Sequence, residues 1–177
     1  TDTLIIDNSL PLLTLSYENL TQPNLINLGK AGDSIRVTAA FNDSITIPPT
    51  LDVQYADSTY DSMEGIPYIS NSNGDSTWIF GFTIASGDSN SGIVTVSVNA
   101  QDKTGNPLTN ANTTNRTLLR VDNIPPYFTS MIPDTGGYVN HTQLGYTIEE
   151  TFSNRLESAI ITWSPLPSGI PINSTLV

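Results

Sequence analysis

The sequence has 177 residues, of which 37% are hydrophobic and 13% charged, so a core is available and much of the polarity comes from Ser, Thr and Asn. Seventeen acidic residues against six basic ones give a net charge of −11, which repels phosphate backbones and excludes nucleic-acid binding. Cysteine is absent, which argues mildly against a small disulfide-stapled domain. No segment has the roughly 18 unbroken apolar residues of a membrane span, so we expect no direct membrane insertion.

Almost every apolar run alternates with polar residues at a period of two, which is typical of strands with one buried face and one face in water. In chain order, the inward-facing residues are predicted to be Leu13, Leu15 and Tyr17, then Ile35, Val37, Ala39 and Phe41, then Leu51, Val53 and Tyr55, then Trp78, Phe80, Phe82 and Ile84, then Val94, Val96, Val98 and Ala100, and finally Leu119 and Val121. No window shows a sustained helical pattern with caps.

Turn-forming residues separate these runs, at 30–33, 42–44, 72–75, 86–88 and 104–107. About seven strands at this spacing over some 110 residues predict an all-β fold, an immunoglobulin-like (Ig-like) antiparallel β-sandwich. Trp78 is expected to fill the gap between the two sheets. The Cys-Trp-Cys pattern of antibody domains is absent, so the prediction concerns the architecture alone.

An internal repeat indicates modules in tandem. Residues 6–11 (Ile-Asp-Asn-Ser-Leu-Pro) are echoed by residues 121–126 (Val-Asp-Asn-Ile-Pro-Pro). A hydrophobic residue, Asp-Asn and then proline predict a last strand, a turn and a stiff exit, because proline fixes φ and extends its predecessor. We therefore expect residues 1–9 to be the tail of a preceding module and its linker, and residues 10–123 to be one complete sandwich.

Residues 124–177 are predicted to be the start of a second Ig-like β-sandwich. Leu144, Tyr146 and Ile148 alternate with polar residues, and so do Ala159, Ile161 and Trp163. These runs predict three or four strands, and half a sandwich would leave a bare edge and an open apolar face. We expect this incomplete module to be completed by further residues of the natural chain, with a strand from a partner as the alternative.

Several stretches resemble the prokaryotic Ig-like repeats of large bacterial and archaeal surface proteins. They are residues 31–39 (Ala-Gly-Asp-Ser-Ile-Arg-Val-Thr-Ala), 77–80 (Thr-Trp-Ile-Phe), 93–98 (Ile-Val-Thr-Val-Ser-Val) and 101–108 (Gln-Asp-Lys-Thr-Gly-Asn-Pro-Leu). The Val-Asp-Asn-x-Pro-Pro joint is typical of how such repeats are connected, and residues 138–147 are similar to another repeat type of the same proteins.

The resemblance implies an extracellular, cell-surface scaffold: a surface-layer (S-layer) or envelope subunit, an adhesin stalk or a fibre. Its partners would be neighbouring Ig-like modules and like subunits. The family includes acidic surface-layer proteins of marine archaea, which agrees with the charge. Two alternatives remain open. One is a binding module for carbohydrate or a host surface, which would use exposed aromatic residues, and the other is an accessory domain of a secreted enzyme. The available aromatic residues are Tyr55, Tyr60, Tyr68, Tyr127 and Tyr138.

Catalysis within this chain is not expected. His141 is the only histidine, and it lies in an Asn-His-Thr turn, where a solvated loop histidine is the better interpretation. A nucleophile elbow, a phosphate-binding glycine loop and a Cys/His zinc cluster are all missing from the sequence. A pair of carboxylates for glycoside chemistry could come only from Asp52, Asp57, Asp61 and Glu64, which also fit a solvated loop.

Calcium is the one cofactor worth weighing, because it takes hard oxygen ligands that often gather where modules meet. The Asp-Asn pairs of the joints, Asp7-Asn8 and Asp122-Asn123, offer such oxygens. The alternative is that each pair caps a turn through its own side chains. A second candidate cluster is Asp57, Asp61 and Glu64, and the EF-hand spacing is not found.

Six Asn-x-Ser/Thr sequences are candidate glycosylation sites. They are Asn19, Asn42, Asn112, Asn115, Asn140 and Asn173. Several arise by chance in a chain this rich in Ser, Thr and Asn. Asn112 and Asn115, in a polar loop, are the first choice for modification in a glycosylating host.

Overall fold

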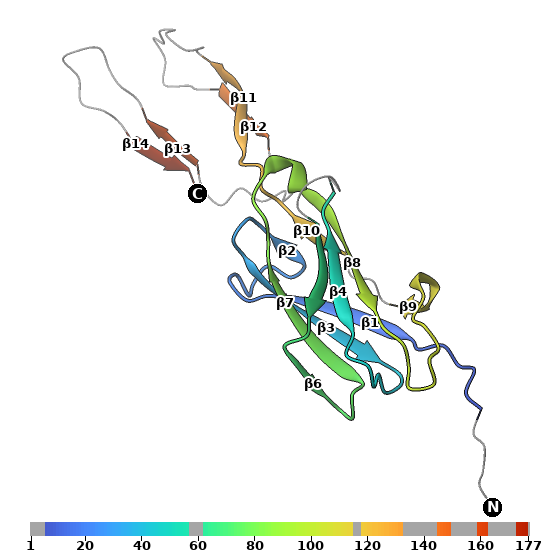
Figure 1. Ribbon diagram of the computed structural model, residues 1–177. Coiled ribbons are helices and arrows are strands. Elements are labelled where there is room, and N and C mark those ends of the chain that lie inside the picture. Colours follow the sequence, from blue (N-terminus) through green and yellow to red (C-terminus); the bar gives the residue numbers. More distant parts are fainter. Residues whose placement is uncertain are drawn as a thin grey trace, which may run out of the picture. The chain divides into compact units, whose positions relative to one another are not determined.

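The structure is a computed structural model that describes residues 6–56, 62–114, 118–132, 145–149, 159–162 and 173–176. The chain divides into two compact units, Thr1–Asn123 (unit 1) and Ile124–Val177 (unit 2). Among the described residues the regular elements are strands and two short 3₁₀ turns, so the predicted all-β fold is confirmed (Figure 1).

Unit 1 contains two five-stranded sheets, one with the order β6-β7-β3-β1-β9 and the other with the order β2-β10-β8-β4-β5. The strands are β1 (Leu13–Asn19), β2 (Leu28–Gly29), β3 (Ser34–Phe41), β4 (Thr50–Gln54), β5 (Met63–Pro67), β6 (Ser70–Ser72), β7 (Thr77–Thr83), β8 (Gly92–Asn99), β9 (Thr113–Thr114) and β10 (Leu119–Val121). The 3₁₀ turn η1 (Asp88–Asn90) precedes β8 in the sequence, and η2 (Asn110–Asn112) lies between β8 and β9.

The register of the first sheet follows from the period of two in the sequence. Ala39 of β3 lies opposite Leu15 of β1 on one side and opposite Trp78 of β7 on the other. Residues directly opposite one another in antiparallel strands point to the same face, so whole rows of apolar side chains turn inward together. All the predicted inward residues of β3 and β7 are buried, and Trp78 is only 2% exposed.

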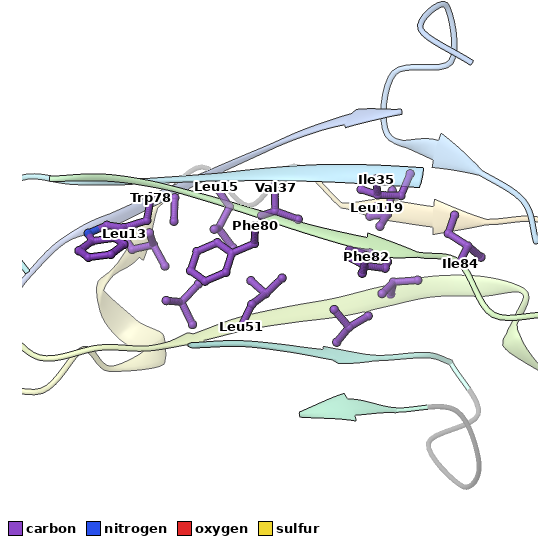
Figure 2. Close-up of a cluster of buried hydrophobic side chains, with 14 of the residues drawn as sticks. Leu13, Leu15, Ile35, Val37, Leu51, Trp78, Phe80, Phe82, Ile84 and Leu119 are labelled. Atoms are coloured by element: carbon purple, nitrogen blue, oxygen red, sulfur yellow. The ribbon is translucent and has the colours of Figure 1, made fainter. Parts of the chain in front are cut away.

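The core lies between the two sheets. Phe80 of β7 is fully buried, and it points into the same space as Leu51 of β4 from the opposite layer (Figure 2). Burial of each apolar side chain of this size contributes about 1.5–3 kcal/mol to the free energy of unfolding. The indole Nε1 of Trp78 donates a hydrogen bond to the carbonyl oxygen of Asp75 at 2.9 Å, which satisfies the polar end of the ring.

Two of the strand pairings are parallel rather than antiparallel. β9 pairs with β1 at the edge of the first sheet, and β10 pairs with β2 at the edge of the second. Residues 113–121 therefore contribute one short strand to each sheet. The chain reaches the joint after Val121 from the second sheet, with β2 alongside it.

The described residues of unit 2 form two antiparallel strand pairs. They are formed by β11 (Tyr127–Ile132) with β12 (Gly145–Glu149), and by β13 (Ala159–Thr162) with β14 (Asn173–Leu176). The predicted alternating residues Tyr146 and Ile148 lie on β12, whereas Leu144 and Trp163 fall outside the described residues.

Candidate functional site

The joint that follows β10 is held to unit 1 by the side chain of Asn123. Its Oδ1 accepts a hydrogen bond from the amide of Ala31 at 2.7 Å. Its Nδ2 donates to the carbonyl oxygens of Ala85 at 3.1 Å and Gly87 at 2.9 Å. The backbone amide of Asn123 also donates to Oγ of Ser91 at 2.9 Å. One residue thus connects the β2–β3 turn with the segment between β7 and β8.

The residue before it continues the sheet. The amide of Asp122 donates to the carbonyl oxygen of Gly29 at 2.9 Å, one step beyond the pairing of Val121 with Gly29. The pairing and the Asn123 bonds together hold residues 121–123 against unit 1. The sequence predicted a stiff exit here from its prolines, and the hydrogen bonds of Asn123 are a second source of stiffness.

The segment that precedes β1, which contains the first Asp-Asn pair, is held to unit 1 by Asn106 of the β8–β9 connection. Nδ2 of Asn106 donates to the backbone carbonyl oxygens of Asp7 and Ser9, each at 3.1 Å. Asp7 closes the turn locally, because its Oδ1 accepts from the amide of Ser9 at 2.9 Å. This is the turn-capping role that was the alternative to calcium binding.

Asp102 orients Asn106. It is 2% exposed, and its Oδ2 accepts from Nδ2 of Asn106 at 2.8 Å. Its Oδ1 accepts from the amide of Asn106 and from the amide and hydroxyl of Thr104, at 2.8–2.9 Å. Burial of the Asp102 carboxyl raises its pKa, but the hydrogen bonds from Asn106 and Thr104 outweigh this, and the net pKa falls from 3.8 to about 2. Asp102 is therefore a charged residue that organises the turn at neutral pH.

Three carboxylates meet at this end of unit 1. Asp7, Asp43 and Asp102 each place an oxygen within 4.8 Å of the others. Calcium takes six to eight oxygen ligands, and oxygens of all three side chains already accept backbone amides, since Oδ1 of Asp43 caps Ser44 at 2.6 Å. Oxygens of Asp7, Asp43 and Asp102 are the ones that could hold a cation here, and calcium at the joints stays a prediction.

Of the four residues predicted as calcium ligands, Asp7 belongs to this cluster, beside two carboxylates that the sequence did not single out, Asp43 and Asp102. Asn8 is exposed, while Asp122 and Asn123 lie at the other joint, where the Asn123 oxygen is bonded to Ala31. The role of Asp102 could have been expected from the sequence, because Asp, Thr and Asn at 102, 104 and 106 are residue types that hydrogen-bond the backbone of their own turn.

The other acidic candidates do not assemble into a catalytic pair in the described residues. Asp52 accepts from the amide of Gly65 at 2.8 Å and from Nδ2 of Asn99 at 2.7 Å, so it braces neighbouring strands. Glu64 is exposed on β5. Asp57, Asp61 and His141 lie outside the described residues.

One hollow of about 250 Å³ lies beside β1 and β8. Its lining contains aliphatic, hydroxyl and amide side chains and no ionisable group, so it offers nothing for acid–base chemistry. The lining residues are Leu13, Leu15, Val96, Ser97, Val98, Asn99, Leu108, Thr109 and Thr113.

The glycosylation candidates differ in accessibility. Asn19 is 3% exposed, and its Nδ2 donates to Oδ2 of Asp33 and to the carbonyl oxygen of Leu28, which leaves no room for a glycan on the folded unit. Asn42 is exposed, and its Oδ1 accepts from the amide of Leu12. Asn112 is half-buried. Asn115, Asn140 and the side chain of Asn173 are outside the described part of the chain.

The aromatic residues that were candidates for glycan binding differ in their burial and contacts. Tyr55 is buried, and its hydroxyl accepts from the amide of Ala85 at 2.9 Å. Tyr68 packs edge-on against Trp78 at 4.7 Å between ring centroids and is 39% exposed. Tyr127 donates to Oε2 of Glu149, and this hydrogen bond and the charge of Glu149 raise the pKa of the phenol. Tyr60 and Tyr138 lie outside the described residues.

The described residues contain no helix with the length and apolar character needed to cross a membrane. The sequence matches no protein-family model, and a comparison with the curated proteins gives no match either.

Proposed function

We propose that this chain is a non-catalytic structural part of an extracellular cell-surface protein, built from Ig-like β-sandwiches in tandem. In this role it acts as a rigid, acidic scaffold within a surface-layer or other envelope assembly. Neighbouring modules and like subunits are its partners.

The strand order of unit 1 supports the Ig-like part of the proposal. In the immunoglobulin fold one sheet has strands A, B, E and D as neighbours, and the other has C, F and G. The neighbours β1, β3, β7 and β6 correspond to the first set, and β4, β8 and β10 correspond to the second. β5 then takes the place of an added strand next to C, as in variable-type domains.

The joint after β10 is the observation that carries the scaffold role. A chain that only linked two independent domains would need no fixed exit, whereas here Asn123 forms three side-chain hydrogen bonds to the unit that it leaves. Pro125 and Pro126 follow at once, and proline restricts both its own φ and the residue before it. Such joints transmit orientation along a tandem array.

The charge of the chain supports a cell-surface location. A net charge of −11 over 177 residues keeps such modules soluble and apart, and it concentrates cations near the surface that they cover. This cation enrichment depends on ionic strength, since charges more than about 8 Å apart are largely screened at physiological salt.

Electron cryo-tomography of the native cell surface tests the proposal, with an antibody raised against residues 10–123 as the label. A periodic sheet that carries the label is the expected result. Sparse labelled stalks would support an adhesin instead, and label confined to the cytoplasm would overturn the proposal.

A further inference from the structure

The two joints have the same sequence pattern but opposite environments. Val121 is fully buried in unit 1, whereas its counterpart Ile6 is 74% exposed. Asn123 forms three side-chain hydrogen bonds, whereas its counterpart Asn8 is exposed and forms none within the described part of the chain. The segment before β1 also leads away from the two sheets (Figure 1).

The backbone on both sides of Asn8 is nevertheless fixed to unit 1. Asn106 binds the carbonyl oxygens of Asp7 and Ser9, so Asn8 is held between two bonded residues with its own side chain free. An exposed aliphatic side chain and a hydrated amide are common on a protein surface, so the sign of a partner here is the comparison with the second joint. At the second joint, the same two residue types are used by the sandwich from which the chain emerges.

We propose that Ile6 and Asn8 are the docking residues for the C-terminal end of another sandwich of the unit 1 type. Ile6 enters that core at the end of its last strand, as Val121 does here. Asn8 bonds to its turns, one backbone amide and two carbonyl oxygens, as Asn123 bonds to Ala31, Ala85 and Gly87. The segment before β1 is then held on both sides, by the Asn8 bonds to the preceding sandwich and by the Asn106 amide of the following one. This inference rests on the proposed tandem scaffold and names its contact.

The first experiment moves the segment within the full chain. Residues 119–126 differ from residues 4–11 at only four positions, so four substitutions convert one into the other: Arg120→Ile, Val121→Ile, Ile124→Ser and Pro125→Leu. The docking role requires this variant to keep the Ala31 amide protected from hydrogen exchange. Adding Asn123→Ala should then reduce the protection roughly tenfold, the effect of one lost hydrogen bond. Loss of protection in the fourfold variant itself would overturn the inference.

The second experiment supplies the missing sandwich. A second copy of residues 9–118 is placed directly before Leu4 of the full chain, so that residues 4–8 are the last strand available to it. We expect the added copy to fold, and we expect Asn8→Asp to lower the Tm of this copy while leaving the Tm of the chain without the added copy unchanged. An added copy that stays unfolded overturns the inference, because the Asn8 contacts have then not formed.

The same fusion separates this inference from the scaffold function. If the added copy folds but reorients freely against its neighbour in NMR residual dipolar couplings, docking by Ile6 and Asn8 is supported and the rigid scaffold fails. If the added copy stays unfolded while units 1 and 2 keep a fixed orientation, docking is refuted and the scaffold stands.

Discussion

Nδ2 of Asn106 lies 3.1 Å from the carbonyl oxygen of Asp7, although 99 residues separate the two in the sequence. The bond connects the β8–β9 turn to the segment before β1, and the buried carboxylate of Asp102 holds the amide in place at 2.8 Å. A single side chain therefore links the entry joint to the second sheet of unit 1.

Replacing Asn106 with alanine should free the entry joint without unfolding unit 1. The variant removes the hydrogen bonds to Asp7, Ser9 and Asp102, and we expect the free energy of unfolding to fall by about 1–3 kcal/mol. Urea denaturation measures the loss, and proteolysis within residues 6–10 should become faster. Asn24→Ala is the matched control, because Asn24 is exposed and forms no side-chain hydrogen bond among the described residues. Equal effects of the two variants would contradict the role of Asn106.

The pKa of Asp102 predicts where unit 1 loses stability in acid. Its folded pKa of about 2 is below the ordinary value of 3.8, so its contribution is fully present above pH 3.8 and disappears as the pH falls through about 2. Asp102→Asn removes the charged acceptor, and we expect its Tm to lie below that of the wild type at pH 7. The gap between the two should narrow between pH 3.8 and about 2 in thermal scans. A gap that stays constant over this window would show that the carboxylate charge has no such role.

Asn123 and Asn8 offer a matched pair of substitutions. In Asn123→Asp the new carboxylate oxygen faces the carbonyl oxygens of Ala85 and Gly87, to which Nδ2 donates in the wild type. We expect a larger loss than in Asn123→Ala, which should cost about 1–3 kcal/mol in urea denaturation. Asn8→Asp makes the same chemical change at the segment before β1. We expect it to leave the free energy of unfolding of the chain without an added copy unchanged. The prediction is wrong if Asn123→Ala is the more damaging of the two Asn123 variants.

The inward-facing residues of the sheets were predictable from the sequence, because apolar residues that alternate with polar ones on a strand form the buried face. Ile35, Val37, Ala39 and Phe41 alternate in the sequence, and all four are buried in β3. The short strands β2 and β9 were not predicted, since two residues carry no periodicity. Their existence depends on parallel pairing with chain segments about 90–100 residues away, which no local pattern encodes.

The two Asp-Asn segments could be located from the sequence, but their hydrogen bonds could not. The repeat located Asp7-Asn8 and Asp122-Asn123, and oxygen-rich residues at module ends suggested calcium. In the structure the Asn123 side chain bonds to backbone groups of distant turns, such as Ala31 and Gly87, whereas the Asp7 side chain accepts from the nearby amide of Ser9. Every residue except proline has the same backbone donor and acceptor. The sequence therefore identifies the side-chain carboxylates and amides but not the backbone groups that they bind.

Gly29 of β2 is buried and lies against side chains of the core. A Cβ atom at this position would overlap Cδ1 of Ile84 and would lie 3.4 Å from Cδ1 of Ile35 and Nδ2 of Asn19. Ile84 is 2% exposed, so its methyl group has little room to move. Gly29→Ala should therefore lower the free energy of unfolding by about 1–3 kcal/mol, the usual cost of an added methyl in a packed core.

A double-mutant cycle tests whether that overlap is the cause of the Gly29→Ala effect. Ile84→Val removes Cδ1 and by itself should cost about 0.5–1.5 kcal/mol. In the double variant the added Cβ occupies the space that Cδ1 vacates, so the combined loss should be smaller than the sum of the single losses. Urea denaturation of the four chains gives this coupling. Additive losses would mean that Gly29→Ala acts through the β2–β10 pairing or through the side chains of Asn19 and Ile35 rather than through Ile84.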